Sequence, residues 1–197
     1  MPARSEAEEM MDKDRMMRAM GEFLAAIGDD SLAAESRKTP ERVATAWCEE
    51  ILEGYSQDPA EILLPLGAPG DCGTVLVKGI EFVSVCVHHL LPFFGKAIVA
   101  YQPGVRLVGL SKVARLVDCR SRRLQIQEDL TRQIVADLME HLKPEGAACF
   151  MEAQHLCMII RGAAKKDSRV VTSVFAGCFE EPKRREELFR LISTRLR

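Results

Sequence analysis

The sequence predicts an α+β fold in which an antiparallel sheet combines with two helices, preceded by a helical N-terminal segment. Three observations lead to this prediction. Apolar residues recur at helical spacing in the first part of the chain, a Pro- and Gly-rich stretch without regular period covers residues 56–73, and β-branched runs follow from Thr74. We therefore expect an N-terminal helical arm and linker over residues 1–70 and a main domain over residues 71–197.

The N-terminal segment carries two helix patterns. Apolar residues at helical spacing predict a first helix over residues 11–27, ended by Gly28 as its C-terminal cap. A second helix is expected over residues 36–54, with Thr39 as its N-cap and Pro40 at the first helical position.

The main domain is expected to run strand, strand, helix, helix, strand, strand, with a closing helix at the end. Strands are predicted at residues 73–87, 96–102, 147–154 with 156–161, and 170–176. Helices are predicted at residues 111–118, 121–142 and 183–196, the first of them capped by Ser111. Residues 121–142 have the clearest helical period of the three because their apolar side chains fall on one face.

Composition limits the functional classes. The chain has 197 residues, 47% of them hydrophobic and 28% charged, which is typical of a globular domain with a real core plus an appendage. The net charge of -2 gives no basic field for nucleic acid or membrane binding, so any phosphate site must come from a local cluster. Seven cysteines without a compact framework, and no secretory pattern, predict a cytoplasmic protein.

The first candidate site lies in residues 83–96, where a thiol and two imidazoles interrupt an apolar run. Burial of such groups is costly unless a partner satisfies them, and Cys86 and His89 are both good zinc ligands. On a straight strand they would point to opposite faces, so a shared metal requires the chain to turn before His89. Pro92 and Gly95 agree with a reversal there. Without a further ligand, two satisfied core side chains remain the alternative.

A second apolar segment supplies a third ligand. His155 and Cys157 are two residues apart and would share one face of a strand. With Cys86 and His89, Cys157 would complete three protein ligands and leave one tetrahedral position for water, as in catalytic zinc sites. His88 and His155 would then remain beside the metal as acid or base groups near neutral pH.

Four blocks, in this order, carry a family resemblance: CVHHLLPFFGK at 86–96, GLSKVAR at 109–115, RRLQIQE at 122–128 and HLCMIIRG at 155–162. In these blocks the chain resembles the GTP cyclohydrolase I family, and the match extends from Thr39 to about Phe189. The resemblance implies a tunnelling fold (T-fold) with ββααββ order. It also implies a homo-oligomer, expected to be a decamer of two pentameric rings with sites between subunits. Edge strands that must not stay open favour the same assembly.

The resemblance implies a reaction and a residue set. A zinc ion held by Cys86, His89 and Cys157 would serve hydrolysis of the GTP imidazole ring, with release of formate and rearrangement to 7,8-dihydroneopterin triphosphate. This is the first step of folate and pterin biosynthesis. The implied catalytic residues are His88, His155 and Ser111. The implied substrate-binding residues are Gln127 and Glu128 for guanine, and Lys112, Arg115, Arg161 and Arg42 for the triphosphate.

The residues themselves leave plainer interpretations open. Ser111, Lys112 and Arg115 fit either an anion site or a solvated helix start. Gln127 and Glu128 fit either an exposed polar face or a guanine partner, since a carboxylate accepts two parallel hydrogen bonds.

The chain departs from the family at Val87, where a Glu is usual, and this replaces a carboxylate beside the metal by an apolar group. One alternative is therefore a divergent paralogue that stops at a ring-opened formamidopyrimidine or acts on a modified purine nucleotide. Another is a catalytically weak ring-forming subunit with a binding or regulatory role. Retention of both His88 and His155 argues against the second, because a scaffold needs neither.

Overall fold

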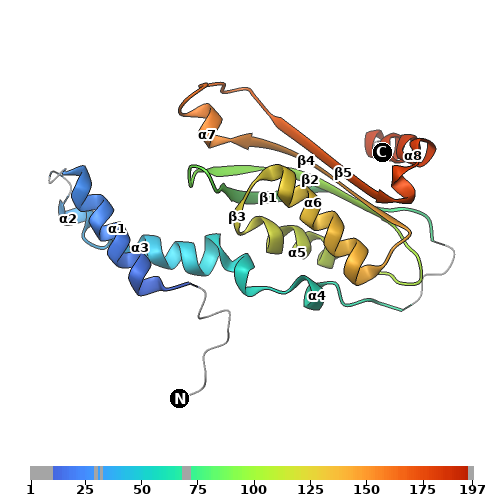
Figure 1. Cartoon of the computed structure of the whole chain (residues 1–197), viewed down its shortest axis with the longest axis horizontal. Helices are drawn as coiled ribbons and strands as arrows, with labels where there is room; N and C mark the ends of the chain where they lie inside the picture. The colour runs from blue at the N-terminus through green and yellow to red at the C-terminus, as the bar shows by residue number, and fades with distance from the viewer. Residues whose placement is uncertain (1–10, 29–30, 32, 68–71, 195–197) are drawn as a thin grey trace, which may run out of the picture. The chain divides into compact units, whose positions relative to one another are not determined.

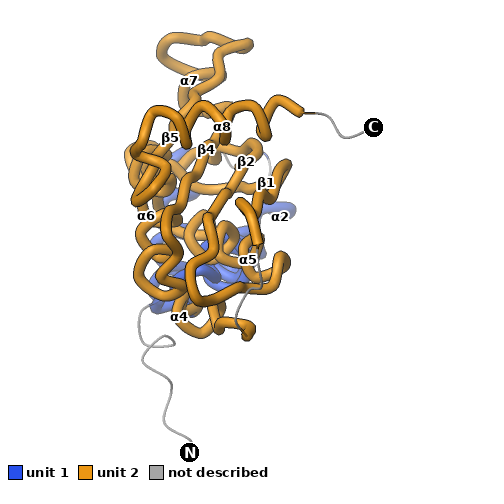
Figure 2. The backbone as a smooth tube through the Cα atoms, turned by 90° about the vertical axis from the view of Figure 1, so that its right-hand side faces the viewer, with its two compact units in different colours: residues 1–56 blue, residues 57–197 orange. Residues whose placement is uncertain are grey.

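The computed structural model describes residues 11–28, 31, 33–67 and 72–194 (Figure 1). The chain forms two compact units, residues 1–56 and residues 57–197, which Figure 2 colours separately. The predicted boundary between arm and main domain, at residue 70, lies outside the described residues. Within those residues no helix is long and apolar enough to cross a bilayer.

The first unit is helical. Its helices are α1 (Lys13–Ile27), α2 (Ala33–Ser36) and α3 (Thr39–Ala46), and α3 continues into η2 (Trp47–Ile51) and η3 (Glu53–Ser56). Gly28 ends α1 with a φ of 70°, as predicted for a left-handed cap. The prediction of Thr39 as N-cap is wrong by one residue, because Lys38 holds that position and Thr39 already belongs to the helix.

The second unit contains one five-stranded sheet. Its strands are β1 (Val75–Cys86), β2 (Pro92–Gln102), β3 (Leu124–Gln125), β4 (Gly146–His155) and β5 (Val170–Gly177). Their order is β3-β1-β2-β4-β5, and every pairing is antiparallel except that of β3 with β1. The sheet therefore agrees with the predicted α+β class and is compatible with a T-fold.

Helices cover both faces of the sheet (Figure 1). The helices of the second unit are α4 (Pro59–Ile62), α5 (Leu110–Ser121), α6 (Gln127–Asp137) with η4 (Leu138–Leu142), α7 (Leu156–Ile159), η5 (Cys178–Glu180) and α8 (Pro182–Ser193). On one face α5 and α6 bury the main core, where Leu116, Leu130 and Ile134 are fully enclosed. On the other face η5 and α8 place Phe179 and Leu188 over alanines of β2 and β4.

Two predicted elements near the site are wrong in part. The helix expected over residues 121–142 begins only at Gln127, because the preceding residues form β3 and pair with the end of β1. The strand expected over residues 156–161 is instead α7 and its following turn, since β4 ends at His155. Both differences depend on strand pairing, which a periodic pattern in one segment does not reveal.

A buried ion pair joins α5 to α6. Arg120 donates two hydrogen bonds to Asp137, at 2.6 Å from Nε and 2.5 Å from Nη2, and the two side chains are 21% and 5% exposed. We expect Asp137→Asn to destabilise the fold by about 2 to 4 kcal/mol, because the guanidinium loses its charged partner in a desolvated place. Denaturant unfolding measures this free energy.

Asp129→Asn is the matched control, because Asp129 lies on the same helix and pairs with Arg132 at the surface. It should change the unfolding free energy by no more than roughly 0.5 kcal/mol. Equal effects of the two variants would contradict a structural role specific to the buried pair.

Candidate active site

The turn after β1 brings two of the predicted metal ligands together. Cys86 is the last residue of β1, and its carbonyl accepts hydrogen bonds from the amides of His89 at 3.3 Å and Leu90 at 2.9 Å. Leu90 adopts a left-handed φ of 54°, which completes the reversal into β2. The turn that the sequence required for a shared metal is therefore present, and it places His89 Nδ1 3.9 Å from Cys86 Sγ.

Cys157 completes the group from α7. One ligand atom each of Cys86, His89 and Cys157 lies within 4.8 Å of the other two. Ligands of a single tetrahedral zinc are about 3.4 to 3.8 Å apart, given metal bonds of about 2.0 to 2.3 Å, so a small contraction would suffice. The strand geometry predicted for His155 and Cys157 is wrong, but the helical turn brings Cys157 to the same group.

The two thiols influence each other. Burial raises the pKa of the Cys157 thiol, and the neighbouring Cys86 raises it further, whereas Arg161 acts in the opposite direction. A dication between the sulfurs would remove this repulsion and favour both thiolates. The donor set of two thiols and one imidazole thus fits zinc and leaves one position open.

His88 lies beside the group without belonging to it. Its Nδ1 is 3.7 Å from Cys86 Sγ, and the side chain is exposed. The adjacent Val87 is 43% exposed. The turn therefore presents an imidazole and an apolar side chain to solvent next to the ligands.

His155 is held rigidly at the end of β4. It pairs in register with Phe93 of β2, and the two rings stack with centroids 4.5 Å apart and planes 3° from parallel. Its Nε2 lies 2.8 Å from Oε1 of Gln127. Burial lowers the pKa of His155, and the nearby Glu128 carboxylate opposes that effect. Burial in this setting therefore favours the neutral imidazole.

Gln127 and Glu128 open α6 and differ sharply in burial. Gln127 is only 1% exposed, whereas Glu128 is exposed to solvent. The contact between Gln127 Oε1 and His155 Nε2 puts the start of α6 next to the histidine. Sequence reasoning missed Phe93 and Thr172 as partners of this region. Phe93 lies inside the first resemblance block, but no sequence signal indicates Thr172.

Comparison with known proteins decides the family. The family model of GTP cyclohydrolase I matches residues 16–193. The chain belongs to the GTP cyclohydrolase I family. Curated GTP cyclohydrolase 1 proteins from three bacteria illustrate the similarity and support the enzyme identity. That of Wolinella succinogenes is 48% identical over 164 residues (83% of this chain, 87% of the relative). The Deinococcus radiodurans protein is 46% identical over 178 residues (89% and 82%), and that of Thermobifida fusca is 45% identical over 185 residues (92% and 89%).

The remaining predicted site residues of this GTP cyclohydrolase I family member lie in three segments of the chain. Ser111 and Lys112 stand in the first turn of α5 and Arg115 follows one turn later. Among the described residues, none of these three makes a hydrogen bond or ion pair with the metal group or with His155. Arg161 follows α7 and lies close enough to Cys157 to affect its pKa.

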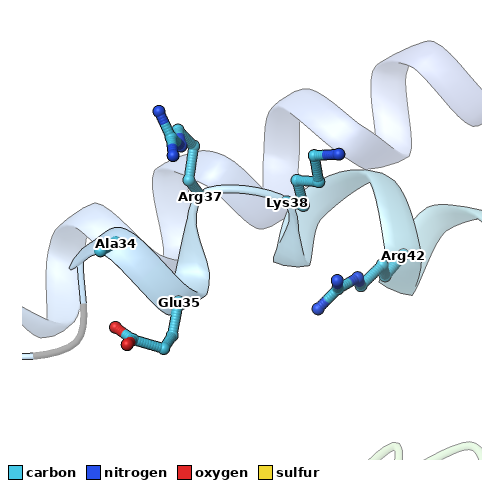
Figure 3. Close-up of a pocket in the computed structure, with 5 residues that line it drawn as sticks. All are labelled: Ala34, Glu35, Arg37, Lys38 and Arg42. Carbon is cyan, nitrogen blue, oxygen red and sulfur yellow. The ribbon is translucent and has the colours of Figure 1, made fainter.

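Arg42 belongs to the first unit. It lines a pocket at the turn between α2 and α3 together with Ala34, Glu35, Arg37 and Lys38 (Figure 3). Three cations and one carboxylate therefore surround this pocket. Within the second unit Arg161 thus lies near Cys157, and Gln127 and Glu128 lie near His155. Arg42 belongs to a cationic cluster of the first unit.

Proposed function

We propose that this family member is a zinc-dependent enzyme that hydrolyses the imidazole ring of GTP, releases formate and rearranges the product to 7,8-dihydroneopterin triphosphate. This is the first step of folate and pterin biosynthesis. The observation that carries the proposal is the convergence of Cys86, His89 and Cys157, a donor set that leaves one position of a tetrahedral metal open, with His155 two residues before Cys157. The family match supports GTP as the substrate.

Each residue would have a distinct role. Cys86, His89 and Cys157 would hold the zinc, which when bound acts as a Lewis acid and generates a nucleophile from water at neutral pH. His155, fixed against Phe93, would give a proton to a ring nitrogen and so assist ring opening. His88 and Ser111 would handle proton transfers around the ribose.

Substrate recognition would use separate groups. The exposed Glu128 would accept two parallel hydrogen bonds from the guanine ring N–H and exocyclic amine, as a bidentate carboxylate can. Gln127 would help to shape the part of the site that holds the guanine base. Lys112, Arg115, Arg161 and Arg42 would bind the triphosphate.

We also propose that the site is completed by assembly, expected as a decamer of two pentameric rings in the cytoplasm. Two features support assembly. β5 is an edge strand, and β3 covers only Val85 and Cys86 of β1, so most of the outer edge of β1 has no paired strand among the described residues of the second unit. Sedimentation analysis tests this, because a stable monomer that is fully active would contradict it.

The first experiment is product analysis. Zinc-loaded protein is incubated with GTP, the products are identified by mass spectrometry, and formate is assayed in parallel. We expect dihydroneopterin triphosphate together with formate. Unchanged GTP in the presence of confirmed zinc would contradict the proposal.

A second candidate is a divergent enzyme that stops at the ring-opened formamidopyrimidine. The observation that favours it is Val87, an exposed apolar side chain between the ligand Cys86 and His88. A formamidopyrimidine without formate in the same product analysis would select this candidate.

Recognition of guanine gives a separate prediction. Glu128→Gln should raise the KM for GTP roughly 10- to 100-fold, because each hydrogen bond to a charged group contributes about 1.5 to 3 kcal/mol. The zinc content should stay unchanged. Steady-state kinetics with GTP measures the effect. Glu152→Gln is the control, since Glu152 is also an exposed carboxylate of this region and pairs with Arg169. An unchanged KM for Glu128→Gln would remove Glu128 from the guanine site.

A further inference from the structure

The buried amide of Gln127 has its orientation fixed by its neighbours. Its Nε2 lies 3.2 Å from the carbonyl oxygen of Met151, 3.1 Å from that of Val170 and 3.1 Å from Oγ1 of Thr172. Carbonyl oxygens can only accept hydrogen bonds, so the atom that faces both of them must be the amide nitrogen. A flipped amide would place its oxygen against two carbonyl oxygens in a site that is 1% exposed.

The threonine hydroxyls agree with this orientation. Thr131 donates its hydroxyl proton to the main-chain carbonyl of Gln127 at 2.7 Å, so in its 2.6 Å contact with Thr172 it must accept. Thr172 therefore donates to Thr131, and its own oxygen is left to accept from Nε2 of Gln127. The two protons of Gln127 Nε2 thus serve three acceptors, one of them shared, and the orientation of the amide follows without reference to the histidine.

The orientation of the Gln127 amide determines which nitrogen of His155 carries a proton. Since Nε2 of Gln127 is used by β4 and β5, Oε1 of Gln127 is the atom that meets Nε2 of His155 at 2.8 Å. An amide oxygen cannot donate, so Nε2 of His155 carries a proton. The stacked Phe93 ring keeps the imidazole in this plane. Among the described residues no protein group hydrogen-bonds to Nδ1 of His155.

We infer that Gln127 is a positioning residue that holds neutral His155 as its Nε2–H tautomer and leaves Nδ1 as the ring nitrogen free for the substrate, so a proton that His155 gives to the purine ring comes from Nδ1 of the imidazolium. This inference rests on the proposed function, in which His155 is the acid or base at the purine ring. It gives Gln127 a role through His155 rather than through a contact with guanine.

Tautomer assignment tests the inference without any assay of activity. The metal-loaded, fully assembled protein is labelled with ¹⁵N-histidine and studied by magic-angle-spinning NMR, which does not depend on particle size. Replacement of His155 assigns its signals among those of the four histidines. We expect a protonated, pyrrole-type Nε2 and an unprotonated Nδ1 for neutral His155. The Nδ1–H tautomer would overturn the inference even if the enzyme turns out to be a GTP cyclohydrolase.

Variant kinetics provide a second readout. Gln127→Met keeps the side-chain length but removes the acceptor, so the tautomer should no longer be fixed. We expect kcat to fall roughly 100-fold, as when a catalytic imidazole loses its orienting partner, with the KM for GTP within about threefold of wild type. A raised KM with unchanged kcat and unchanged tautomer would instead make Gln127 a guanine contact.

Thr131→Val is the matched control, because it removes two hydrogen bonds of the same network but leaves Oε1 of Gln127 facing His155. It should keep the Nε2–H tautomer and change kcat by less than about threefold, although a lost hydrogen bond costs about 1 kcal/mol of stability. If Thr131→Val lowered kcat as much as Gln127→Met does, kcat would depend on the packing of the whole network and not on the acceptor Oε1 of Gln127. If Gln127→Met does not fold, the ¹⁵N-histidine NMR spectrum of the wild-type protein still tests which tautomer His155 adopts.

Discussion

Cys157→Ala is expected to remove the metal and with it the activity. We expect the zinc content to fall from about one ion per chain to a small fraction, because only Cys86 and His89 would remain as ligands. Formate release from GTP should fall roughly 1,000-fold or more, since a bound metal contributes several kcal/mol of transition-state stabilisation. Plasma mass spectrometry of the dialysed protein measures zinc, and the formate assay measures turnover.

The fold should survive this change. Cys157 is half-buried, and α7, the short helix that carries it, contains no fully buried residue. Circular dichroism should therefore show a folded protein, with a melting temperature reduced only by the lost metal linkage. Cys48→Ala is the matched control, because it deletes another half-buried free thiol that lies in the first unit. Full zinc retention by Cys157→Ala would refute the proposed ligand set.

Gly95→Ala is expected to have the largest effect on stability. Gly95 of β2 faces Ala153 of β4, and a Cβ at Gly95 would lie 1.8 Å from the carbonyl oxygen of Glu152 and 2.7 Å from Cα of Ala153. Both contacts are with main chain, which cannot move aside without opening the β2–β4 ladder. We expect a loss of roughly 4 kcal/mol or more, which is a large part of the total stability of a typical domain. Denaturant unfolding measures it.

The same substitution also bears on the site. The Phe93–His155 pair is two positions along the same ladder from Gly95, so a shifted register would displace the stacked histidine. Gly73→Ala is the matched control, because a Cβ there would have no neighbour within 4 Å. It should change the unfolding free energy by no more than about 0.5 kcal/mol. A similarly small change for Gly95→Ala would show that β2 and β4 are not held as closely as described.

The sequence predicted which residues gather as possible metal ligands more reliably than it predicted their secondary structure. The pair Cys86 and His89 required a turn, and β1 does end at Cys86 and reverse before Pro92. Cys157 was placed on a strand, yet it joins the same group from α7. Ligand identity follows from residue type and spacing, whereas strand or helix at such a short segment depends on what pairs with it.

The start of α6 shows the limit of pattern reasoning. Residues 121–142 have one helical period, but Ser121 ends α5 and Leu124–Gln125 form β3 against the end of β1, which no local pattern reveals. Gln127 and Glu128 are adjacent polar residues and look alike in the sequence. Only the packed structure separates them, because β4 and β5 bury the amide while the carboxylate stays exposed.

The sequence by itself thus determined the α+β class, the metal-ligand types and the resemblance to the GTP cyclohydrolase I family, because these depend on residue identity and order. The tertiary structure decided which polar group faces which. The direction of the Gln127–His155 hydrogen bond is fixed by two main-chain carbonyls far away in the chain, at Met151 and Val170. Such a constraint arises only when separate segments meet and must satisfy their buried donors and acceptors together.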